Sequence, residues 1–341
     1  GMIPGLNLSV GNSGGALNSK LSIDIRGTGT IGSGSNASPL ILIDGSEGDM
    51  NALSASDIEN ISVLKDASAS SIYGSRAAFG VILITTKSGR EGKPRVSYTG
   101  NVRFATATQI PEMMDSEMFA KYFNAAGANS GNGVVFNDAA MKRILAYKAG
   151  RSEKGDEFGT EWNDRDQNWA LYTNAWANTN WFDEMYRKNA PTQEHNLSVS
   201  GGSGNVNYYV SGAVLDQQGI IRHGSDLFKR YNLTAKMNIK ILPWLTLGYT
   251  NRWTREEYSR PSYMTGLFFH NIARRWPTNP VRDPNGHYVA GNEIIQMEGS
   301  GIDRTQKDYS AQQITLEARP IAGLMLRAEN NYNVTSANNH W

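Results

Sequence analysis

Seven stretches of the chain after residue 93 alternate between apolar and polar residues. The clearest covers 230–241, where every second residue from Tyr231 to Ile241 is apolar and the residues between them are polar. A period of two predicts a β-strand whose two faces meet different surroundings. The same alternation predicts strands at 94–104, 195–201, 206–214, 245–252, 312–319 and 324–334.

Short and long connections alternate between these expected strands. The short ones are tight turns at 202–205, 242–243 and 320–323, whereas the long ones cover 105–194, 215–229 and 253–311. This order is typical of an outer-membrane β-barrel, which has short periplasmic turns and long outer loops. A soluble β-sandwich shares the apolar–polar alternation but has no reason to collect its long loops at one end.

The first ninety residues have a different pattern. Short β-prone runs at 21–26, 40–43, 58–65 and 81–87 are separated by turn residues. The pattern predicts a short helix at 51–58 and offers Asp57 as an N-cap, and 66–75 has a weak helical pattern. We therefore expect a small α+β domain over 1–92, followed by the alternating strands over 93–341.

Two amphipathic helices are expected in the first long loop, at 115–126 and 137–148, with N-caps at Asp115 or Ser116 and at Asn137. Aromatic residues follow them. They either pack the loop onto itself or form a contact surface for sugar rings or a partner protein. The residues concerned are Trp162, Trp169, Trp176 and Trp181.

Composition removes several classes of function. The 33 basic and 32 acidic residues give a net charge of +1, so no basic excess points to nucleic acid. Without cysteine there is no disulfide, zinc–thiolate site or cysteine nucleophile. The five histidines are scattered, which argues against a histidine-rich metal site. We expect no cofactor and no metal.

Three short motifs fit catalysis or metal binding poorly. The G-x-G-x-x-G match at 27–32 is followed by a loop where a dinucleotide site needs a helix. The S-x-x-K match at 62–65 falls in a strand pattern and lacks its partner S-D-N element. Residues 283–286 lack the other ligands of a calcium loop, and a type I turn explains them. The chain is therefore not expected to be an enzyme.

Two stretches carry a resemblance to a known family. They are PLILIDG at 39–45 and DIENISVLKDASASSIYGSRAAFGVILITTK at 57–87. Both closely resemble the plug domain of SusC/RagA-type TonB-dependent outer-membrane transporters. Further segments look like the early barrel of the same family, in the family's order: 181–184, 195–202, 207–209 and 216–221.

The resemblance implies an α+β plug seated inside a 22-stranded transmembrane β-barrel in the outer membrane of a Gram-negative bacterium of the Bacteroidetes type. It also implies energy from the TonB–ExbB–ExbD complex and a SusD-like surface lipoprotein that delivers oligosaccharide or peptide. Outer-membrane lipid would surround the barrel. The alternative from a different class is a soluble β-rich module for carbohydrate binding or adhesion.

Site residues follow from the same resemblance. Arg26 and Arg76 match plug arginines that pair with glutamates of the barrel wall, although an ordinary surface or turn arginine remains open. Specificity would come from the outer loops, from polar side chains that face the lumen, and from a plug loop that faces outward. The residues of that loop are Asp44, Gly45, Glu47, Asp49 and Asn51.

The chain also departs from the family. The TonB box would precede residue 1, and about seven strands stand where the family has 22. Seven strands alone would leave two unpaired edges, which lipid does not tolerate. We therefore expect an N-terminal fragment: the plug and an incomplete antiparallel transmembrane β-barrel.

Overall fold

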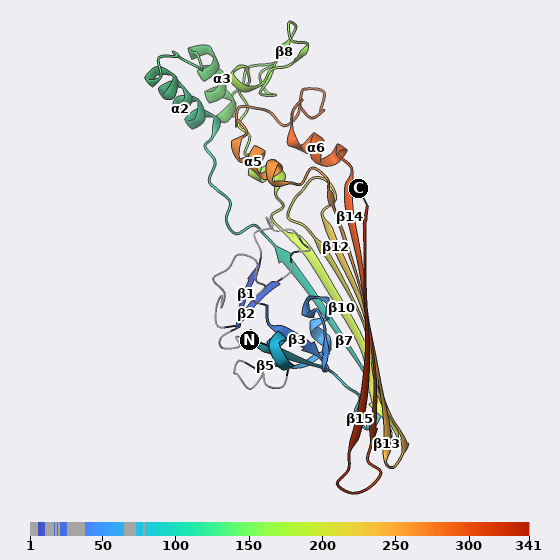
Figure 1. The fold of residues 1–341 in the computed structure, drawn as a ribbon. Coiled ribbons are helices and arrows are strands. Elements are labelled where there is room, and N and C mark those ends of the chain that lie inside the picture. The colour runs from blue at the N-terminus through green and yellow to red at the C-terminus, as the bar shows by residue number, and fades with distance from the viewer. Residues whose placement is uncertain are drawn as a thin grey trace.

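The computed structural model describes residues 6–10, 17, 19, 21–25, 38–64, 73–77 and 79–340. Two units are distinguished below. The inner domain comprises the described residues up to 86, and the wall is a seven-stranded sheet that begins at Gly92. The inner domain lies against one face of the wall (Figure 1). Arg26 and the glycine motif at 27–32 lie outside the described residues.

The inner domain contains two small sheets. Strands β1 (Leu6–Val10) and β2 (Leu21–Ile25) pair with each other. The second sheet has the order β4-β3-β6-β5, in which β3 and β6 are parallel. Its strands are β3 (Leu40–Ile43), β4 (Ser46–Glu47), β5 (Ile58–Leu64) and β6 (Val81–Thr86). The four strand segments expected in this region are confirmed within one or two residues.

The helix expected at 51–58 is wrong. Two 3-10 turns stand there, η1 (Met50–Ala52) and η2 (Ala55–Asp57), and a third, η3 (Gly74–Ala77), follows β5. The cap of η1 is Asp49, which accepts a hydrogen bond from the Asn51 N–H at 3.0 Å. Asp57 is the last residue of η2, and its carboxylate is bound by the wall, as described below. Most of 66–75 lies outside the described residues.

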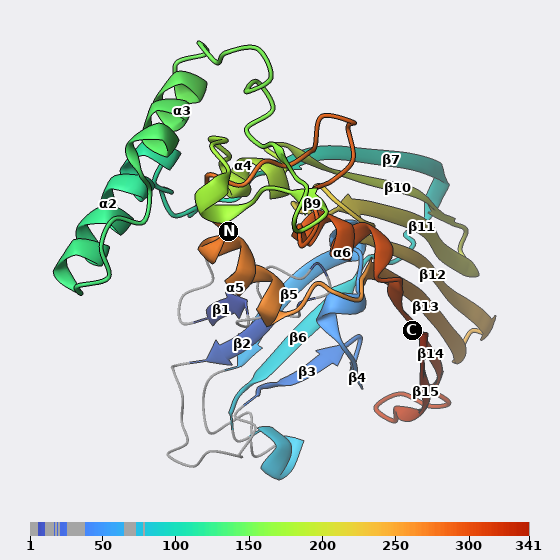
Figure 2. The same ribbon diagram turned by 90° about the horizontal axis from the view of Figure 1, so that it is seen from above.

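The wall confirms all seven alternating segments as strands of one antiparallel sheet, in the order β15-β14-β13-β12-β11-β10-β7. Most strands run further toward the long loops than the pattern indicates, because the apolar–polar alternation is lost there. In β14, for example, the five residues from Asp303 to Lys307 are all polar. Figure 2 shows the wall curving around the inner domain. The strands are β7 (Gly92–Ala105), β10 (Ala190–Gly202), β11 (Val206–Gln218), β12 (Leu227–Leu242), β13 (Leu245–Pro261), β14 (Ile302–Ala318) and β15 (Leu326–His340).

The long connections fold into an outer-loop layer at one end of the wall (Figure 1). Both expected helices are present, with Asp115 and Asn137 as their N-caps. The layer has its own core around Trp181, Phe268 and Ile294. No helix in the described part of the chain is long and apolar enough to cross a membrane. The elements are α2 (Ser116–Asn129), α3 (Asp138–Lys148), β8 (Trp162–Asn163), β9 (Asn168–Trp169), η4 (Tyr172–Asn174), α4 (Trp181–Met185), α5 (Gly266–Arg274) and α6 (Glu293–Gly299).

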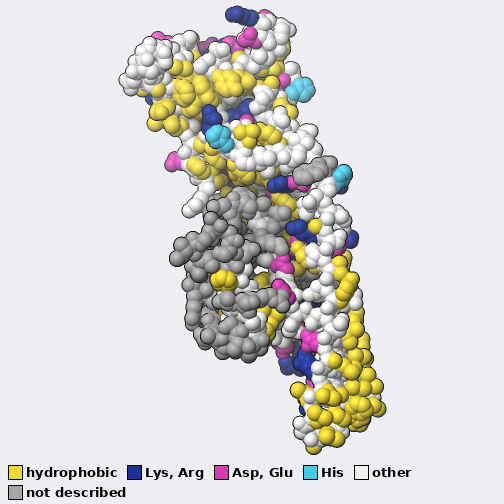
Figure 3. Space-filling model, viewed as in Figure 1, with side chains coloured by type: hydrophobic (Ala, Val, Ile, Leu, Met, Phe, Trp, Pro, Cys, Tyr) yellow, Lys and Arg dark blue, Asp and Glu magenta, His cyan; other side chains and the backbone are white. Residues whose placement is uncertain are grey.

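The face of the wall that points away from the inner domain carries an apolar belt. Leu233 is 47% exposed and Met237 39%, and Figure 3 shows hydrophobic side chains gathered over the lower part of the sheet. Large side chains are exposed here on every strand of the wall, and no second sheet covers them in the described structure. The belt includes Val96, Tyr98, Leu197, Val210, Val214, Leu233, Met237, Tyr249, Ile314, Leu316, Tyr332 and Val334.

The upper edge of the belt lies at different heights on different strands. One row of outward residues, read through the strand register, is Tyr98, Leu197, Gly212, Leu233, Trp253, Ser310 and Val334. Outward apolar residues continue six positions above this row on β7, to Phe104, and two positions above it on β11 and β12. They stop in the row on β10, β13 and β15, and four positions below it on β14, at Ile314.

Candidate functional site at the interface of the inner domain and the wall

Four successive inward positions of β12 all contact the inner domain. This spacing follows from the period of two, which turns every second side chain toward the concave face of the wall. The contacts join Arg230 Nη1 to Asn51 O at 2.7 Å, Asn232 Nδ2 to Ala52 O at 2.6 Å, Thr234 Oγ1 to Asp57 Oδ2 at 3.0 Å and Lys236 Nζ to Asp44 Oδ1 at 3.0 Å.

Asp44 is positioned by a tight hairpin between β3 and β4. Ile43 pairs with Ser46, which leaves Asp44 and Gly45 as the two turn residues. Both have positive φ, +52° and +90°, as a type I′ turn requires, and Asp-Gly is a favoured sequence for it. The Thr86 N–H and hydroxyl donate to the Asp44 carboxylate at 2.9 and 2.6 Å.

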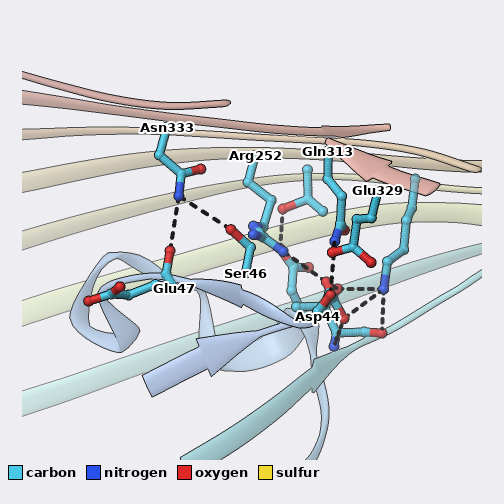
Figure 4. A network of polar contacts seen from close by, with 11 residues as sticks. Asp44, Ser46, Glu47, Arg252, Gln313, Glu329 and Asn333 are labelled. Atoms are coloured by element: carbon cyan, nitrogen blue, oxygen red, sulfur yellow. Dashed lines mark hydrogen bonds and ion pairs between the residues drawn. The ribbon is translucent and has the colours of Figure 1, made fainter. Parts of the chain in front are cut away.

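The Asp44 carboxylate binds two cations of the wall. Lys236 donates to one oxygen at 3.0 Å and Arg252 to the other at 2.8 Å, and all three side chains are about nine-tenths buried (Figure 4). Burial alone would raise the pKa of Asp44, but Lys236 and the two bonds from Thr86 outweigh it and hold the pKa below its usual value. Removing one partner of such a buried cluster costs roughly 3–5 kcal/mol, because a charge is left uncompensated.

Asp57 forms a second anchor with neutral partners. Its side chain is buried, and its carboxylate accepts hydrogen bonds from Tyr209 Oη at 2.8 Å, Thr234 Oγ1 at 3.0 Å and Asn196 Nδ2 at 3.4 Å. These donors lie on β11, β12 and β10. A hydrogen bond to a charged group contributes roughly 1.5–3 kcal/mol, so the anchor is strong without any cation.

The contacts continue to the last strand of the wall. Gln313 on β14 donates to Asp44 O at 3.1 Å and to Glu329 at 2.7 Å, and Asn333 on β15 donates to Glu47 O at 3.0 Å (Figure 4). A cavity of about 170 Å³ lies between residues 47–53 and strands β13–β15. Among its lining residues are Arg252, Thr254, Tyr309 and Asn333.

The apolar cores of the two units are separate. The clusters around Ile43, Ile82 and Ile84 and around Leu42 and Val81 contain only inner-domain residues. Within the described structure, the one apolar cluster that joins the two units is the packing of Leu17 against Leu215, Phe228 and Tyr258 of the wall. The interface at Asp44 and Asp57 is therefore mainly polar.

The predicted loop residues differ in their surroundings. Asp44 points to the wall and not toward open solvent, and Asp49 caps η1 while Asn51 offers its carbonyl to Arg230. Gly45 and Glu47 are exposed. Contact of this loop with substrate stays a prediction. Arg26 and the Arg76 side chain lie outside the described residues, so their pairing with wall glutamates stays a prediction too.

The four loop tryptophans divide into two pairs. Trp176 and Trp181 are 2% and 1% exposed, so both pack the outer-loop layer onto itself. The Trp181 indole donates to the Trp276 carbonyl at 3.0 Å. Trp162 is 45% exposed and meets Trp169 edge-on, with ring centroids 5.4 Å apart. A contact surface for sugar or a partner protein stays a prediction for this second pair.

The sequence interpretation missed Asp57, Tyr209, Lys236 and Arg252. One signal was available, because Lys236 and Arg252 are charges on the polar side of two strongly alternating segments. The structure describes no group of three acidic or histidine side chains that could hold a metal. Asp283 accepts from the Asn285 and His287 N–H groups and so closes a turn, as the turn interpretation expects.

Comparison with known proteins agrees with this arrangement. The family profile of the TonB-dependent receptor plug domain matches residues 1–81. SusC, a TonB-dependent receptor of Bacteroides thetaiotaomicron, is 35% identical over 230 residues, covering 64% of this chain and 18% of SusC. TonB-dependent receptor P26 of Formosa agariphila is 28% identical over 282 residues, covering 80% of this chain and 24% of that receptor.

Solved structures show the same fold. The RagAB peptide transporter superposes with a TM-score of 0.74 at 24% identity, covering 99% of this chain and 38% of the matched chain. The siderophore receptor PirA of Acinetobacter baumannii gives 0.51 at 16% identity. The chain spans less than two thirds of each of these proteins. The plug-domain match and the similarity to SusC together support assignment of this chain to the SusC/RagA-type TonB-dependent receptors, a family of outer-membrane proteins.

Proposed function

We propose that this chain supplies the inner domain and part of the wall of an importer that carries nutrients across the outer membrane. One observation carries the proposal: the same strands present an apolar belt on one face and a polar, closely fitted inner domain on the other. That combination suits a channel through lipid that is closed by a movable domain.

The polar interface makes movement of the inner domain feasible. Hydrogen bonds and ion pairs can be exchanged for bonds to water, whereas apolar packing cannot be separated without exposing hydrophobic surface. The inner domain keeps its own core around Ile43, Ile82 and Ile84. It can therefore shift as a unit when force is applied, and we assign that force to the TonB–ExbB–ExbD complex.

The substrate and the outer partner are proposed from the relatives. SusC is the relative with the highest sequence identity described above, and RagAB is named as a peptide transporter. We assign oligosaccharide or peptide as the cargo and a SusD-like surface lipoprotein as the partner above the outer-loop layer. The relatives are receptors, and we assign no catalytic activity to this chain.

The soluble binding module is not favoured. A sandwich would bury its apolar faces between two sheets. Here Leu233, Met237 and Ile314 are exposed, and the sheet that faces the wall belongs to a domain bound through polar groups. A soluble protein rarely exposes an apolar patch of this extent.

Growth tests the proposed function. Deleting the gene that encodes the full-length receptor should abolish growth on the oligosaccharide or peptide that it imports, and the intact gene should restore growth. A host lacking TonB should not grow on that substrate even with the gene present. Unchanged growth of both strains on every oligosaccharide and peptide mixture tried would contradict the proposal.

A further inference from the structure

Four aromatic rings form a continuous ridge on the outer-loop layer. Tyr122 and Phe123 belong to α2, Trp276 follows α5, and Tyr172 belongs to η4. Neighbouring ring centroids lie 6.0, 4.7 and 5.5 Å apart in the order Tyr122–Phe123–Trp276–Tyr172. The two end rings are exposed, and the two rings between them are half-buried. These four residues are called the aromatic ridge below.

The backbone of Tyr172 is held in an unfavourable conformation. Its φ of +59° lies in the left-handed region, which glycine adopts readily and a bulky L-residue does not. Two buried residues hold it there: the Tyr172 N–H donates to Asn279 Oδ1 at 2.6 Å, and Thr278 Oγ1 donates to the Tyr172 carbonyl at 2.9 Å. Glycine would fit this backbone without strain, and the exposed tyrosine ring adds little packing. The strain therefore points to a use for the ring outside the fold.

The segments that carry the aromatic ridge offer little charge to a ligand. Residues 168–182 and 276–281, which surround Tyr172 and Trp276 in the sequence, contain no charged side chain. Lys121 and Arg275 directly precede two of the rings, and each binds a carboxylate of the outer-loop layer at 2.7 Å. These contacts favour neither an acidic nor a basic ligand.

Amide groups lie beside the aromatic ridge. Asn174 is exposed two residues after Tyr172, and its side chain has no partner among the described residues. The Oδ1 atom of Asn178 accepts two hydrogen bonds from Ser116 at the start of α2, which leaves its Nδ2 group available to donate. Amides exchange hydrogen bonds with hydroxyl groups without a charge, and aromatic faces pack against the apolar face of a sugar ring. The ridge thus has the chemistry of a site for neutral sugar.

We propose that the aromatic ridge is an outer subsite for a neutral oligosaccharide, whose sugar rings stack along it from Tyr172 to Tyr122. Asn174 binds hydroxyl groups at the Tyr172 end. Figures 1 and 2 both show α5 above the inner domain, so a sugar held beside Trp276 lies on the outer side of that domain. This inference rests on the proposed import function and narrows its cargo from oligosaccharide or peptide to neutral oligosaccharide.

Titration calorimetry on the purified full-length receptor tests the subsite. The probes are four neutral sugars, maltohexaose, cellohexaose, mannohexaose and xylohexaose, and one acidic sugar, hexagalacturonate. At least one neutral sugar should bind, and more tightly than hexagalacturonate. Tyr172→Gly should weaken that binding about tenfold because a stacking ring is lost, while the unfolding temperature stays at or above that of the wild type because glycine relieves the strained φ. Tyr172→Phe keeps the ring and should bind as the wild type does.

A matched control completes the test. Phe158→Ala removes an exposed ring of the same layer outside the aromatic ridge and should bind sugar as the wild type does. Unchanged binding by Tyr172→Gly, an equal loss in Phe158→Ala, or no binding of any neutral sugar would overturn the proposal. Loss of a co-purifying surface lipoprotein from Tyr172→Gly, with sugar binding intact, would also overturn it and assign the ridge to a protein contact. TonB-dependent growth on a peptide or an acidic sugar would then leave the import function standing, so the two failures are distinguishable.

Discussion

The two faces of the wall use the same strands in opposite ways. On the inward face, four successive polar side chains of β12 meet particular atoms of the inner domain, as Lys236 meets Asp44. On the outward face, neighbours such as Leu233 and Met237 have no particular partner. Attachment of the inner domain therefore depends on which polar atom stands at each inward position. The outward positions only need an apolar side chain.

The largest effect is expected at Asp44. Asp44→Asn keeps the shape of the side chain but leaves Lys236 and Arg252 buried without their counter-ion, which should weaken attachment of the inner domain by about 3–5 kcal/mol. Hydrogen–deuterium exchange of the β3 and β6 amides in the full-length receptor measures this. Asp164→Asn, on an exposed loop residue, is the control, and equal protection in both variants would refute the ionic anchor.

The pH dependence of this anchor has a definite sign. The folded pKa of Asp44 is lowered, so the stabilisation is present above the ordinary value of 3.8 and is lost only as pH falls below it. The same exchange measurement should therefore show an attached inner domain throughout the neutral range.

A charge on the outward face should have the next largest effect. Met237→Arg places a cation within the belt and should destabilise the membrane-inserted receptor by about 2–4 kcal/mol. Met237→Leu preserves volume and polarity and should change stability by less than about 1.5 kcal/mol. Refolding into lipid vesicles over a denaturant series gives both values. Equal stability of the two variants would show that this face does not meet lipid.

Substitutions of two adjacent tyrosines on β11 allow the stability contributions of the two faces to be compared directly. Tyr209 points inward and donates to Asp57, whereas Tyr208 is its outward neighbour on β11. Tyr209→Phe should cost about 1.5–3 kcal/mol through the lost bond to a carboxylate. Tyr208→Phe should stay within about 0.5 kcal/mol. Chemical denaturation of the two variants measures the difference, and identical values would remove the distinction between the faces.

The smallest effect concerns the turn between β11 and β12. Burial raises the pKa of Asp226 to about 6, against weaker opposing effects of Tyr258, Arg187 and Arg260. Because the folded pKa is raised, the turn loses stability as pH increases from about 4 through 6. Exchange of the Gly219 N–H, which donates to Asp226 O at 2.8 Å, should accelerate beyond its intrinsic rate over that interval. Asp226→Asn should remove the additional pH dependence.

The sequence predicted the wall better than the interface. Alternation is a local property, so the segment 230–241 was sufficient to predict β12 and to assign Leu233 and Thr234 to opposite faces. The contacts of Asp44 were not predictable in this way. Lys236 lies 192 positions further along the chain, and no local pattern indicates which turn of the inner domain it meets.

Asp57 also shows that a local sequence pattern does not reveal a long-range contact. Its position before a β-prone run is compatible with a helix N-cap, and the local sequence favoured that interpretation. The structure instead uses its carboxylate for three wall strands, and the backbone forms two short 3-10 turns. The tryptophans differ for a similar reason, because burial of Trp176 and exposure of Trp162 depend on contacts with segments such as α3 and β9.

The chain order of the two anchors has a consequence for biogenesis. The partners of Asp57 lie on β10, β11 and β12, whereas Asp44 also needs Arg252 on β13 and Gln313 on β14. If strands are added in the order of synthesis, the hydrogen bonds to Asp57 can be complete before all the contacts of Asp44 have formed. The nascent receptor can thus bind its inner domain early, through hydrogen bonds to Asp57 from uncharged side chains. The ion pair between Arg252 and Asp44 forms later, when β13 has been added.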